Sequence, residues 1–375
     1  MKVLYITNGF FGSNEANMIQ SHNTVSALCA EGSVGQVCFI AHTDKTPELK
    51  TLTKEHENAT DSLSSLKLQF SPVVINRNSW VKTLYALYQT LKSINYKEYD
   101  VVYTRSREAL VLLFMLGFKK FSFEAHALKY PSSPYKEVLY NVAIKYGRMN
   151  IVSINQTLQD DFKSIYNINP SRLSLIPCSA RTSLEVSLPL QDRRFIVFCG
   201  SSYPGKGLDE FVKLSLEYPQ YDFLAISRSS QYLEDTISLA GDNLSVKKDL
   251  SNKQVYKYLA NSYIAFAPYS KEAQTSGGES NARYLSPLKI FEYMSMGCLI
   301  ISSDLDSIQE VITNGESACL YQADNYYSLK DAFNHAFSLI QEGEAEGIVN
   351  SALYKFQLNY SYTARAKMIC ASVRG

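Results

Sequence analysis

The sequence predicts an α/β protein with two Rossmann-like, doubly wound parallel-sheet domains that face a cleft. Short apolar, β-branched runs alternate with helical patterns from the first residue, which is typical of parallel strands covered by helices on both faces. The alternation occurs twice, in two series that a polar stretch separates. The length of 375 residues also suits about two domains.

The first series predicts an N-terminal domain over residues 1–185. Its expected strands are residues 3–6, 37–40, 66–70, 101–103, 121–123 and 151–154, and helical patterns cover 16–30 and 80–94. In the second helix, four apolar residues recur at helical spacing, so we expect them in the core. They are Leu84, Leu87, Tyr88 and Leu91.

The second series predicts a C-terminal domain over residues 186–357. Residues 181–194 lack helical periodicity, contain Pro189 and end in three charged side chains, which indicates a linker. The strands expected after it are residues 195–199, 223–226, 264–267 and 299–301. In such sheets ligands bind at the carboxyl ends of the strands, so the loops that follow the strands are the candidate sites.

Composition excludes several classes of protein. The chain is 46% hydrophobic and 19% charged, with a net charge of +1, which excludes a disordered chain and a basic chain that coats nucleic acid. The longest apolar stretch, 109–118, is too short to span a membrane, and no secretory signal is recognisable. The seven cysteines lie in apolar runs, which favours buried thiols in a cytoplasmic protein. Neither CxxC nor HxxxH occurs, so no structural zinc is expected.

Two glycine-bearing loops follow expected strands and suit a bound anion. The first contains Gly9 and Gly12, and the second, residues 199–207, contains Lys206 just before a helical pattern. Glycines let the backbone approach a ligand, and a lysine at a helix start suits a phosphate oxygen. The alternative is that these glycines are plain turn residues and that Lys206 is a solvated loop lysine.

A third motif lies in residues 286–297, SPLKIFEYMSMG. Ser286 suits the N-cap of a helix, Pro287 suits its first turn, and Gly297 suits its end. Lys289 and Glu292 are three residues apart and share a helix face. At the mouth of a cleft the lysine would bind a diphosphate and the carboxylate the ribose hydroxyls, whereas on a plain helix surface they would form a weak ion pair.

The segment SPLKIFEYMSMGCLIISSDLDSIQEVI resembles the donor site of GT-B glycosyltransferases of the large retaining family four, particularly the bacterial polysaccharide branch with an SPxKxFEYM motif. Residues 200–207 resemble the GxLxPxKG loop of that family and 123–126 its YEVH segment. Residues 153–155 with 176–177, and 360–366, resemble two further stretches. The resemblance follows nearly the whole chain in the family's order.

The resemblance implies a retaining glycosyltransferase of the hexosyltransferase type. It would move a sugar from a UDP- or GDP-linked donor to a saccharide or lipid-linked acceptor, in the synthesis of cell-surface polysaccharide or glycoconjugate. The C-terminal helix, 358–375, would cross back onto the first domain. No cofactor and no metal ion are expected, because lysines already neutralise the phosphates and no DxD motif stands at a strand end.

The resemblance also implies the site residues. Lys206 and Lys289 would hold the diphosphate and act in catalysis with His126, which would contact the donor sugar. Glu292 would bind the ribose, and Gly12 would allow the close approach of the first loop. The donor-binding set is completed by Ser201, Ser202, Ser286, Pro287 and Leu288.

Three positions depart from the family pattern. Tyr284 stands where the family often has a glutamate, Ser201 stands in place of an arginine, and Cys178 with Ser179 replaces an Asn-Gly pair. Diphosphate binding would then rest on the two lysines and on backbone N–H groups, with Arg228 and Arg283 as further candidates.

Two other functions remain open from sequence. One is a nucleotide-sugar epimerase of the same fold, for which Glu124 and His126 are the evident acid–base groups. The other is a non-catalytic nucleotide-binding partner, which the changes at Ser201 and Tyr284 motivate.

The acceptor side is expected on the first domain. Residues 80–94 and 133–148 place basic and tyrosine side chains close together, which suits contact with anionic lipid headgroups at the inner face of a membrane and equally suits an ordinary solvated face. These residues are Lys82, Tyr85, Lys92, Tyr135, Lys136, Tyr140, Lys145, Tyr146 and Arg148.

Overall fold

The computed structural model describes residues 1–11, 16–43, 65–72, 80–118, 120–128, 134–182, 188–272 and 282–373. The chain divides into two compact units. One comprises Met1–Cys178 with Tyr362–Gly375, and the other comprises Ser179–Ser361. The sequence placed the corresponding borders at 185/186 and 357/358.

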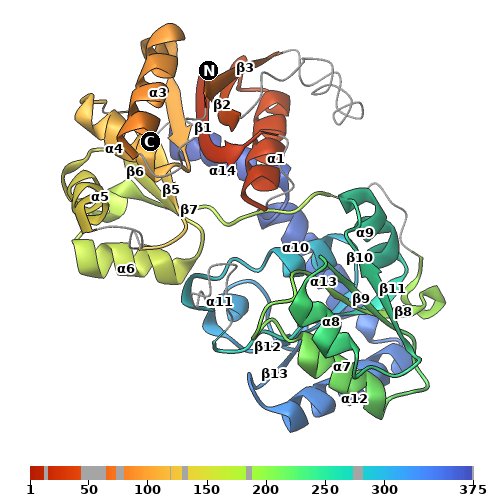
Figure 1. The fold of residues 1–375 in the computed structure, drawn as a ribbon. Coiled ribbons are helices and arrows are strands. Elements are labelled where there is room, and N and C mark those ends of the chain that lie inside the picture. Colours follow the sequence, from red (N-terminus) through yellow and green to blue (C-terminus); the bar gives the residue numbers. More distant parts are fainter. Residues whose placement is uncertain are drawn as a thin grey trace. The chain divides into compact units, whose positions relative to one another are not determined.

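The first unit contains a seven-stranded sheet in which every described pair of neighbouring strands is parallel (Figure 1). The strand order is β3-β2-β1-β4-β5-β6-β7. The strands are β1 (Lys2–Phe10), β2 (Gln36–Thr43), β3 (Leu66–Pro72), β4 (Val101–Thr104), β5 (Phe121–Ala125), β6 (Asn150–Ser153) and β7 (Leu173–Leu175).

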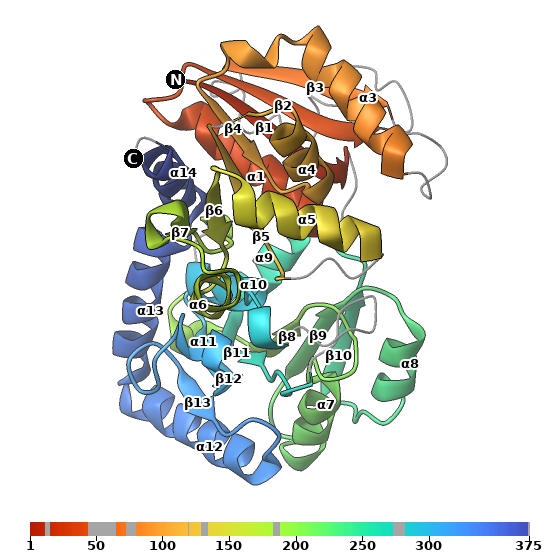
Figure 2. The same cartoon turned by 90° about the vertical axis from the view of Figure 1, so that its left-hand side faces the viewer.

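Helices cover both faces of this sheet, as the uniformly apolar strands predict. On one face α3, α4 and α5 pack side by side, and on the other α1 packs against α14 (Figures 1 and 2). The α-helices are α1 (Ala16–Ala30), α3 (Trp80–Ser93), α4 (Arg107–Met115), α5 (Pro134–Tyr146), α6 (Gln156–Tyr166) and α14 (Tyr362–Ser372), with short helical turns η2 (Tyr96–Glu98) and η3 (Pro170–Arg172).

The described helices of the first unit bear out the predicted core of residues 80–94 in part. Leu87 and Leu91 are buried, Leu84 is half-buried, and Tyr88 is exposed over 37% of its surface. The expectation for Tyr88 is therefore wrong. At helical spacing, Tyr88 falls at the border of the apolar stripe formed by Leu84, Leu87 and Leu91.

The second unit contains a six-stranded sheet, also parallel at each described pair, in the order β10-β9-β8-β11-β12-β13. Its strands are β8 (Phe195–Cys199), β9 (Phe223–Ser227), β10 (Leu244–Lys248), β11 (Ser262–Ala267), β12 (Leu299–Ser303) and β13 (Cys319–Tyr321). Its helices are η4 (Leu190–Asp192), α7 (Leu208–Glu217), α8 (Gln231–Ile237), α9 (Asn252–Ala260), η5 (Ala282–Tyr284), α10 (Leu288–Ser295), α11 (Asp306–Gln309), α12 (Tyr326–Glu342) and α13 (Ala345–Asn359).

Aromatic rings fill the core of this second unit. Phe211 of α7 makes an edge contact with Phe266 of β11 at 5.6 Å, and Phe333 of α12 lies 6.0 Å from Phe266. Two tyrosines extend the cluster, with Tyr218 at 4.5 Å from Phe333 and Tyr221 stacked on Phe337 at 4.2 Å. Part of the high tyrosine content thus serves ordinary packing.

Each sheet has one point at which the strand order reverses direction, between β1 and β4 in the first unit and between β8 and β11 in the second. Ligands of doubly wound sheets bind beside such points, at the carboxyl ends of the strands. In the first unit Arg105 follows β4, and its N–H donates to the Ile6 carbonyl of β1 at 3.1 Å. In the second, Gly200 follows β8 and Tyr269 lies two residues beyond β11.

Two general features follow from the described ranges. All seven cysteines are thiols, six buried and Cys29 half-buried. None of the helices in these ranges has both the length and the apolar character that crossing a bilayer would require.

Candidate functional site

The loop between β8 and α7 contains two glycines in backbone conformations that other residues rarely adopt. Gly207 is the N-cap of α7 with φ +81°, and a Cβ built there would lie 2.0 Å from the Pro268 carbonyl oxygen. Gly200 has φ +149°, and a Cβ there would lie 3.4 Å from Cε of Lys289. Glycine therefore allows the loop to pass directly beside the end of β11 and the side chain of Lys289.

Tyr293 ties helix α10 to the same two strand ends. Its hydroxyl accepts from the N–H of Cys199 at 2.9 Å and lies 3.2 and 3.0 Å from the carbonyl oxygens of Cys199 and Phe266. Lys289 precedes Tyr293 by four residues and shares its helix face. The buried tyrosine thus places Lys289 at the point where the strand order reverses.

Lys289 has a buried amino group for which the described residues provide no hydrogen-bond partner. Its exposed fraction is 7%, and its ammonium lies 4.4 Å from the ring centres of both Phe198 and Tyr269. No residue that the structure describes accepts a hydrogen bond from it. Burial, aided by the charge of Lys206, lowers the pKa of Lys289 to about 7. A buried, unpaired ammonium is costly, so this position favours an anionic ligand.

Lys206 adds a second cation to the same ring. Its ammonium lies 5.2 Å from the ring centre of Tyr269, and burial lowers its pKa. The charge of Lys206 disfavours the charged form of Lys289, and an anion bound beside the two lysines would offset this effect. Two ammonium groups beside the start of α7 form a site whose chemistry matches a diphosphate.

Glu292 follows Lys289 by three residues and is half-buried. Burial raises the pKa of its carboxyl to about 7, against the lowering effect of Lys289. A carboxyl at this place can accept hydrogen bonds from neighbouring hydroxyl groups of a ligand. The structure thus gives Lys289 and Glu292 the burial that a solvated helix-surface pair would lack.

Apart from Gly12, the other predicted donor residues lie in the same unit, with one local difference. The N-cap of α10 is Pro287, not Ser286, because the N–H of Leu288 closes a tight turn onto the Ser286 carbonyl at 2.9 Å. The hydroxyl of Ser286 is buried and makes no hydrogen bond within the described ranges. Gly297 follows the end of the helix with φ +60°, as expected.

The serines after β8 differ from each other. Ser202 is buried, with its hydroxyl 2.8 Å from that of Ser230, whereas Ser201 is exposed. Arg228 and Arg283 are exposed, at the end of β9 and in η5. Gly12 lies outside the residues that the structure describes, so its predicted role remains a prediction.

In the first unit, Glu124 is the centre of a buried charge cluster. Its Oε2 accepts from Arg365 at 2.5 Å and from the Tyr103 hydroxyl at 2.6 Å, and its Oε1 lies 3.3 Å from Nε of Arg105. Burial by itself would raise the pKa of Glu124, but Arg365 and Arg105 hold it well below its usual range. The carboxylate is therefore ionised, and both of its oxygens have partners.

His126 lies on top of this cluster. Its Nε2 is 2.9 Å from Oε1 of Glu124 and 2.9 Å from Nη2 of Arg105, and its side chain is 35% exposed. Burial and the charge of Arg105 lower the pKa of His126, against the raising effect of Glu124. A neutral imidazole with one exposed edge can donate or accept a hydrogen bond with a sugar hydroxyl.

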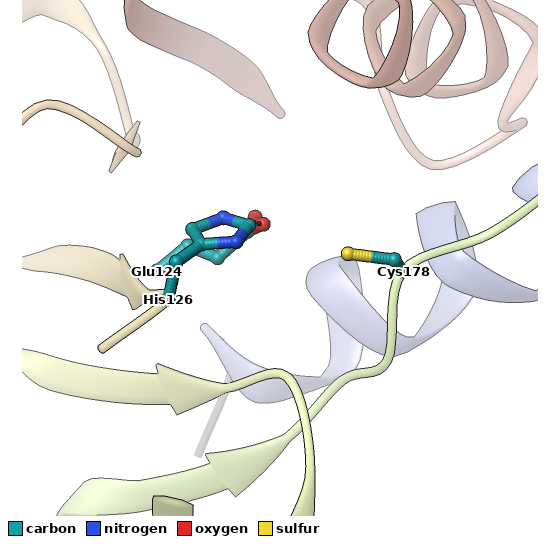
Figure 3. A group of neighbouring side chains, drawn as sticks. All are labelled: Glu124, His126 and Cys178. Carbon is teal, nitrogen blue, oxygen red and sulfur yellow. Dashed lines mark hydrogen bonds and ion pairs between the residues drawn. The ribbon is translucent and has the colours of Figure 1, made fainter. Parts of the chain in front are cut away.

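Glu124, His126 and Cys178 also bring three ligand-type atoms within 4.8 Å of one another, as Figure 3 shows. The carboxylate, however, already pairs with Arg365 and Arg105, whose positive charges would repel a metal ion. These three side chains therefore do not suit a metal ion. They form a site in which Glu124 and Arg105 fix the orientation of the His126 ring.

Three residues of these sites were not among those predicted from the sequence. The ring of Tyr269 lies beside the ammonium groups of both lysines, Arg105 contacts His126, and Arg365 forms an ion pair with Glu124. The first two follow strands β11 and β4 at the points of reversal, which is a signal that strand order would have supplied. Arg365 lies within the segment 360–366, but nothing in the sequence indicates its partner.

Comparison with known protein families gives one match, which lies within the second unit. Residues 193–338 match the family model described as "Glycosyl transferases group 1". The matched residues include the β8–α7 loop, Tyr269 and helix α10. The match covers most of the second unit and 39% of the chain. Among curated proteins, no match to the chain was found.

Solved structures share the fold over the whole chain. A glycosyltransferase from Rickettsia africae is 16% identical, with 100% of this chain and 97% of that chain covered and a TM-score of 0.73. Sucrose-phosphate synthase from Thermosynechococcus elongatus is 14% identical, with coverage of 100% and 98% and a TM-score of 0.72. HepE from Anabaena, in complex with UDP, is 13% identical, with coverage of 100% for both chains and a TM-score of 0.70. These similarities establish the GT-B fold.

Proposed function

We propose that this chain is a retaining glycosyltransferase that transfers a sugar from a nucleoside diphosphate-sugar to a saccharide or lipid-linked acceptor. The observation that carries the proposal is the pair of lysines on Tyr269, of which Lys289 is buried without a partner in the described ranges. Both lie in the segment that matches the glycosyltransferase group 1 model. A UDP-linked or GDP-linked donor suits this site, and HepE, which has the same fold, was solved with UDP.

The lysines would supply most of the catalysis. As the bond between the sugar and the diphosphate breaks, negative charge grows on the leaving phosphate, and pre-positioned ammonium groups stabilise it. Because Lys206 and Lys289 already provide two positive charges, the proposed reaction needs no metal ion. Glu292 would accept hydrogen bonds from the ribose hydroxyls and so fix the nucleotide beside the lysines.

His126 would act on the transferred sugar. The neutral imidazole can hydrogen-bond a sugar hydroxyl through its exposed edge. Glu124 is unsuited to be a covalent nucleophile, because two arginines and Tyr103 occupy its oxygens. This favours attack by the acceptor from the side of the leaving group over a covalent double displacement.

The outward faces of α3 and α5 suggest where a lipid-linked acceptor is approached. Val81, Tyr85 and Tyr88 follow one another along the exposed side of α3, which has no acidic residue. On α5 the corresponding side chains are Tyr135, Val138, Val142 and Tyr146. Exposed apolar and tyrosine side chains beside Lys92 and Lys145 suit the interface of an anionic membrane, so we propose peripheral binding at its inner face.

A panel of UDP- and GDP-sugars, incubated with and without membrane lipid extract, tests the proposal. We expect release of the nucleoside diphosphate that depends on the added acceptor. Conversion of the donor without release would instead establish an epimerase, and binding without turnover of any donor would establish a non-catalytic protein. Product NMR would then give the sugar, the linkage and the retained anomeric configuration.

A further inference from the structure

We propose that Arg365, in the C-terminal helix α14, is a positioning residue that fixes His126 through the carboxylate of Glu124. The inference rests on the proposed function, because it gives His126 a role in the transfer. It concerns a contact between residues 241 positions apart in the chain.

The two oxygens of Glu124 serve different partners. Oε2 accepts from Nη2 of Arg365 at 2.5 Å and from Tyr103 at 2.6 Å. Oε1 faces Nε2 of His126 at 2.9 Å and Nε of Arg105 at 3.3 Å. Because one rigid carboxylate links both ends, the pull of Arg365 on Oε2 sets the direction in which Oε1 meets the imidazole.

Arg365 is itself held by three further acceptors. Its Nε donates to Oγ1 of Thr24 on α1 at 3.2 Å, and its Nη1 donates to the carbonyl oxygens of Ile176, at 3.3 Å, and of Pro177. The planar guanidinium is thus fixed from α1 and from the segment after β7. A lysine has a single nitrogen and cannot reproduce this set of bonds.

The cluster opens to the outside at the histidine. The side chains of Glu124 and Arg365 are fully buried, that of Arg105 is 5% exposed, and that of His126 is 35% exposed. A cluster that served folding alone would not need to end in an exposed imidazole. The buried network of Arg365, Glu124 and Arg105 instead fixes the orientation of the accessible ring of His126.

The charged groups around His126 lower its pKa or raise it, according to their sign. The groups that face it or its carboxylate from neighbouring elements are Tyr5, Tyr103, Arg105, Glu124, Cys178 and Arg365. Two guanidinium groups oppose one carboxylate, so the surplus charge is positive and disfavours a protonated imidazole. Removal of Arg365 would reduce this surplus and leave more of the Glu124 charge to His126, so the pKa of His126 would rise.

Histidine-selective NMR titration tests this without any substrate. The chain has five histidines, and His126→Asn assigns the signal. In Arg365→Gln we expect the pKa of His126 to rise by about one unit. Arg365→Lys keeps the charge and should leave the pKa close to that of the wild type. Lys367→Gln, which removes an exposed cation from the same helix, is the matched control and should change nothing.

Turnover gives the second readout. We expect kcat of Arg365→Gln to fall roughly tenfold to a hundredfold at an unchanged KM for the donor, with partial recovery in Arg365→Lys. If Arg365→Gln does not fold, Glu124→Gln/Arg365→Gln is compared with Glu124→Gln. Equal rates would then support action through Glu124, and a further loss would overturn it.

An unchanged pKa of His126 in folded Arg365→Gln would also overturn the proposal. A wild-type protein that turns over no donor would overturn the proposed function instead, while the titration would still report on the contact with Arg365.

Discussion

Lys289 and Tyr269 are packed against each other in the core of the second unit, with the ammonium of Lys289 4.4 Å from the ring centre. The attraction between a cation and the face of an aromatic ring offsets part of the free energy that the cation loses when it leaves water. The ring also contacts Lys206, so Tyr269 holds two positive charges together where no described residue pairs with Lys289. Under the proposed function, this contact holds positive charge in place before an anionic ligand binds.

The first prediction concerns pH. The pKa of Lys289 is about 7 in the ligand-free protein, and a bound diphosphate would raise it. Above pH 7 binding must therefore take up a proton, so affinity for a nucleoside diphosphate falls by up to about tenfold per pH unit until the pKa of the complex is reached. Calorimetry in buffers of different ionisation enthalpy measures the uptake. Lys289→Met should lose it, and an affinity independent of pH above 7 contradicts the assignment.

The second prediction concerns the stability of the first unit. Replacing Glu124 by Leu leaves Arg105 and Arg365 buried without their carboxylate, which should cost about 3–5 kcal/mol. The single tryptophan, Trp80, lies in this unit, so its fluorescence during urea unfolding reports the loss.

The matched control for Glu124 is Glu234→Leu, which removes the carboxylate from an exposed ion pair with Lys248. Such surface pairs contribute at most about 1 kcal/mol. Calorimetry follows the unfolding of the second unit, which contains Glu234. If Glu124→Leu and Glu234→Leu lower the free energy of unfolding of their units equally, the buried cluster does not stabilise the first unit as predicted.

The third prediction concerns the β8–α7 loop. Gly207→Ala would bring its Cβ against the Pro268 carbonyl in a backbone conformation with positive φ, so we expect a loss of more than about 1 kcal/mol and of nucleotide binding. Gly347→Ala is the control, because Gly347 lies in α13 with open space around it. That substitution should raise thermal stability slightly. Normal nucleotide affinity in Gly207→Ala would show that the loop does not form the site.

The fourth prediction concerns the membrane. Tyr85→Ser combined with Val138→Ser should reduce binding to vesicles that contain anionic lipid, while leaving nucleotide affinity unchanged. Tyr354→Ser is the control, because Tyr354 is exposed to a similar extent, 65% against 63% for Tyr85, but lies on α13 of the other unit. Sedimentation with vesicles measures the difference, and an equal effect of Tyr354→Ser would contradict a dedicated face.

Much of the fold could be predicted because its main strands are apolar on both faces. All ten strands expected from sequence are present. The strands that escaped prediction, β7, β10 and β13, are sheet-edge strands, and their partial exposure weakens the apolar signal. The sequence predicts parallel, doubly wound sheets but not the order of their strands, because periodicity does not show which strands become neighbours.

The site was predictable where neighbouring residues carry it. Lys289 and Glu292 are one helical turn apart, so their spacing reveals them. The contacts of Tyr269 with the lysines, and of Arg365 with Glu124, join residues far apart in sequence, and only folding brings them together. The burial of Lys289 was equally hidden, because it depends on Phe198 and Tyr269 closing over it.

The most direct test of the central claim is calorimetric titration of UDP and of GDP into three proteins. These are the wild type, Lys289→Met, and Lys253→Met, which removes an exposed lysine from α9. We predict that one nucleotide binds the wild type and Lys253→Met equally, and that Lys289→Met binds it at least about tenfold more weakly, a loss of about 1.4 kcal/mol or more. Equal affinity in Lys289→Met, or no binding of either nucleotide to the wild type, would contradict the account.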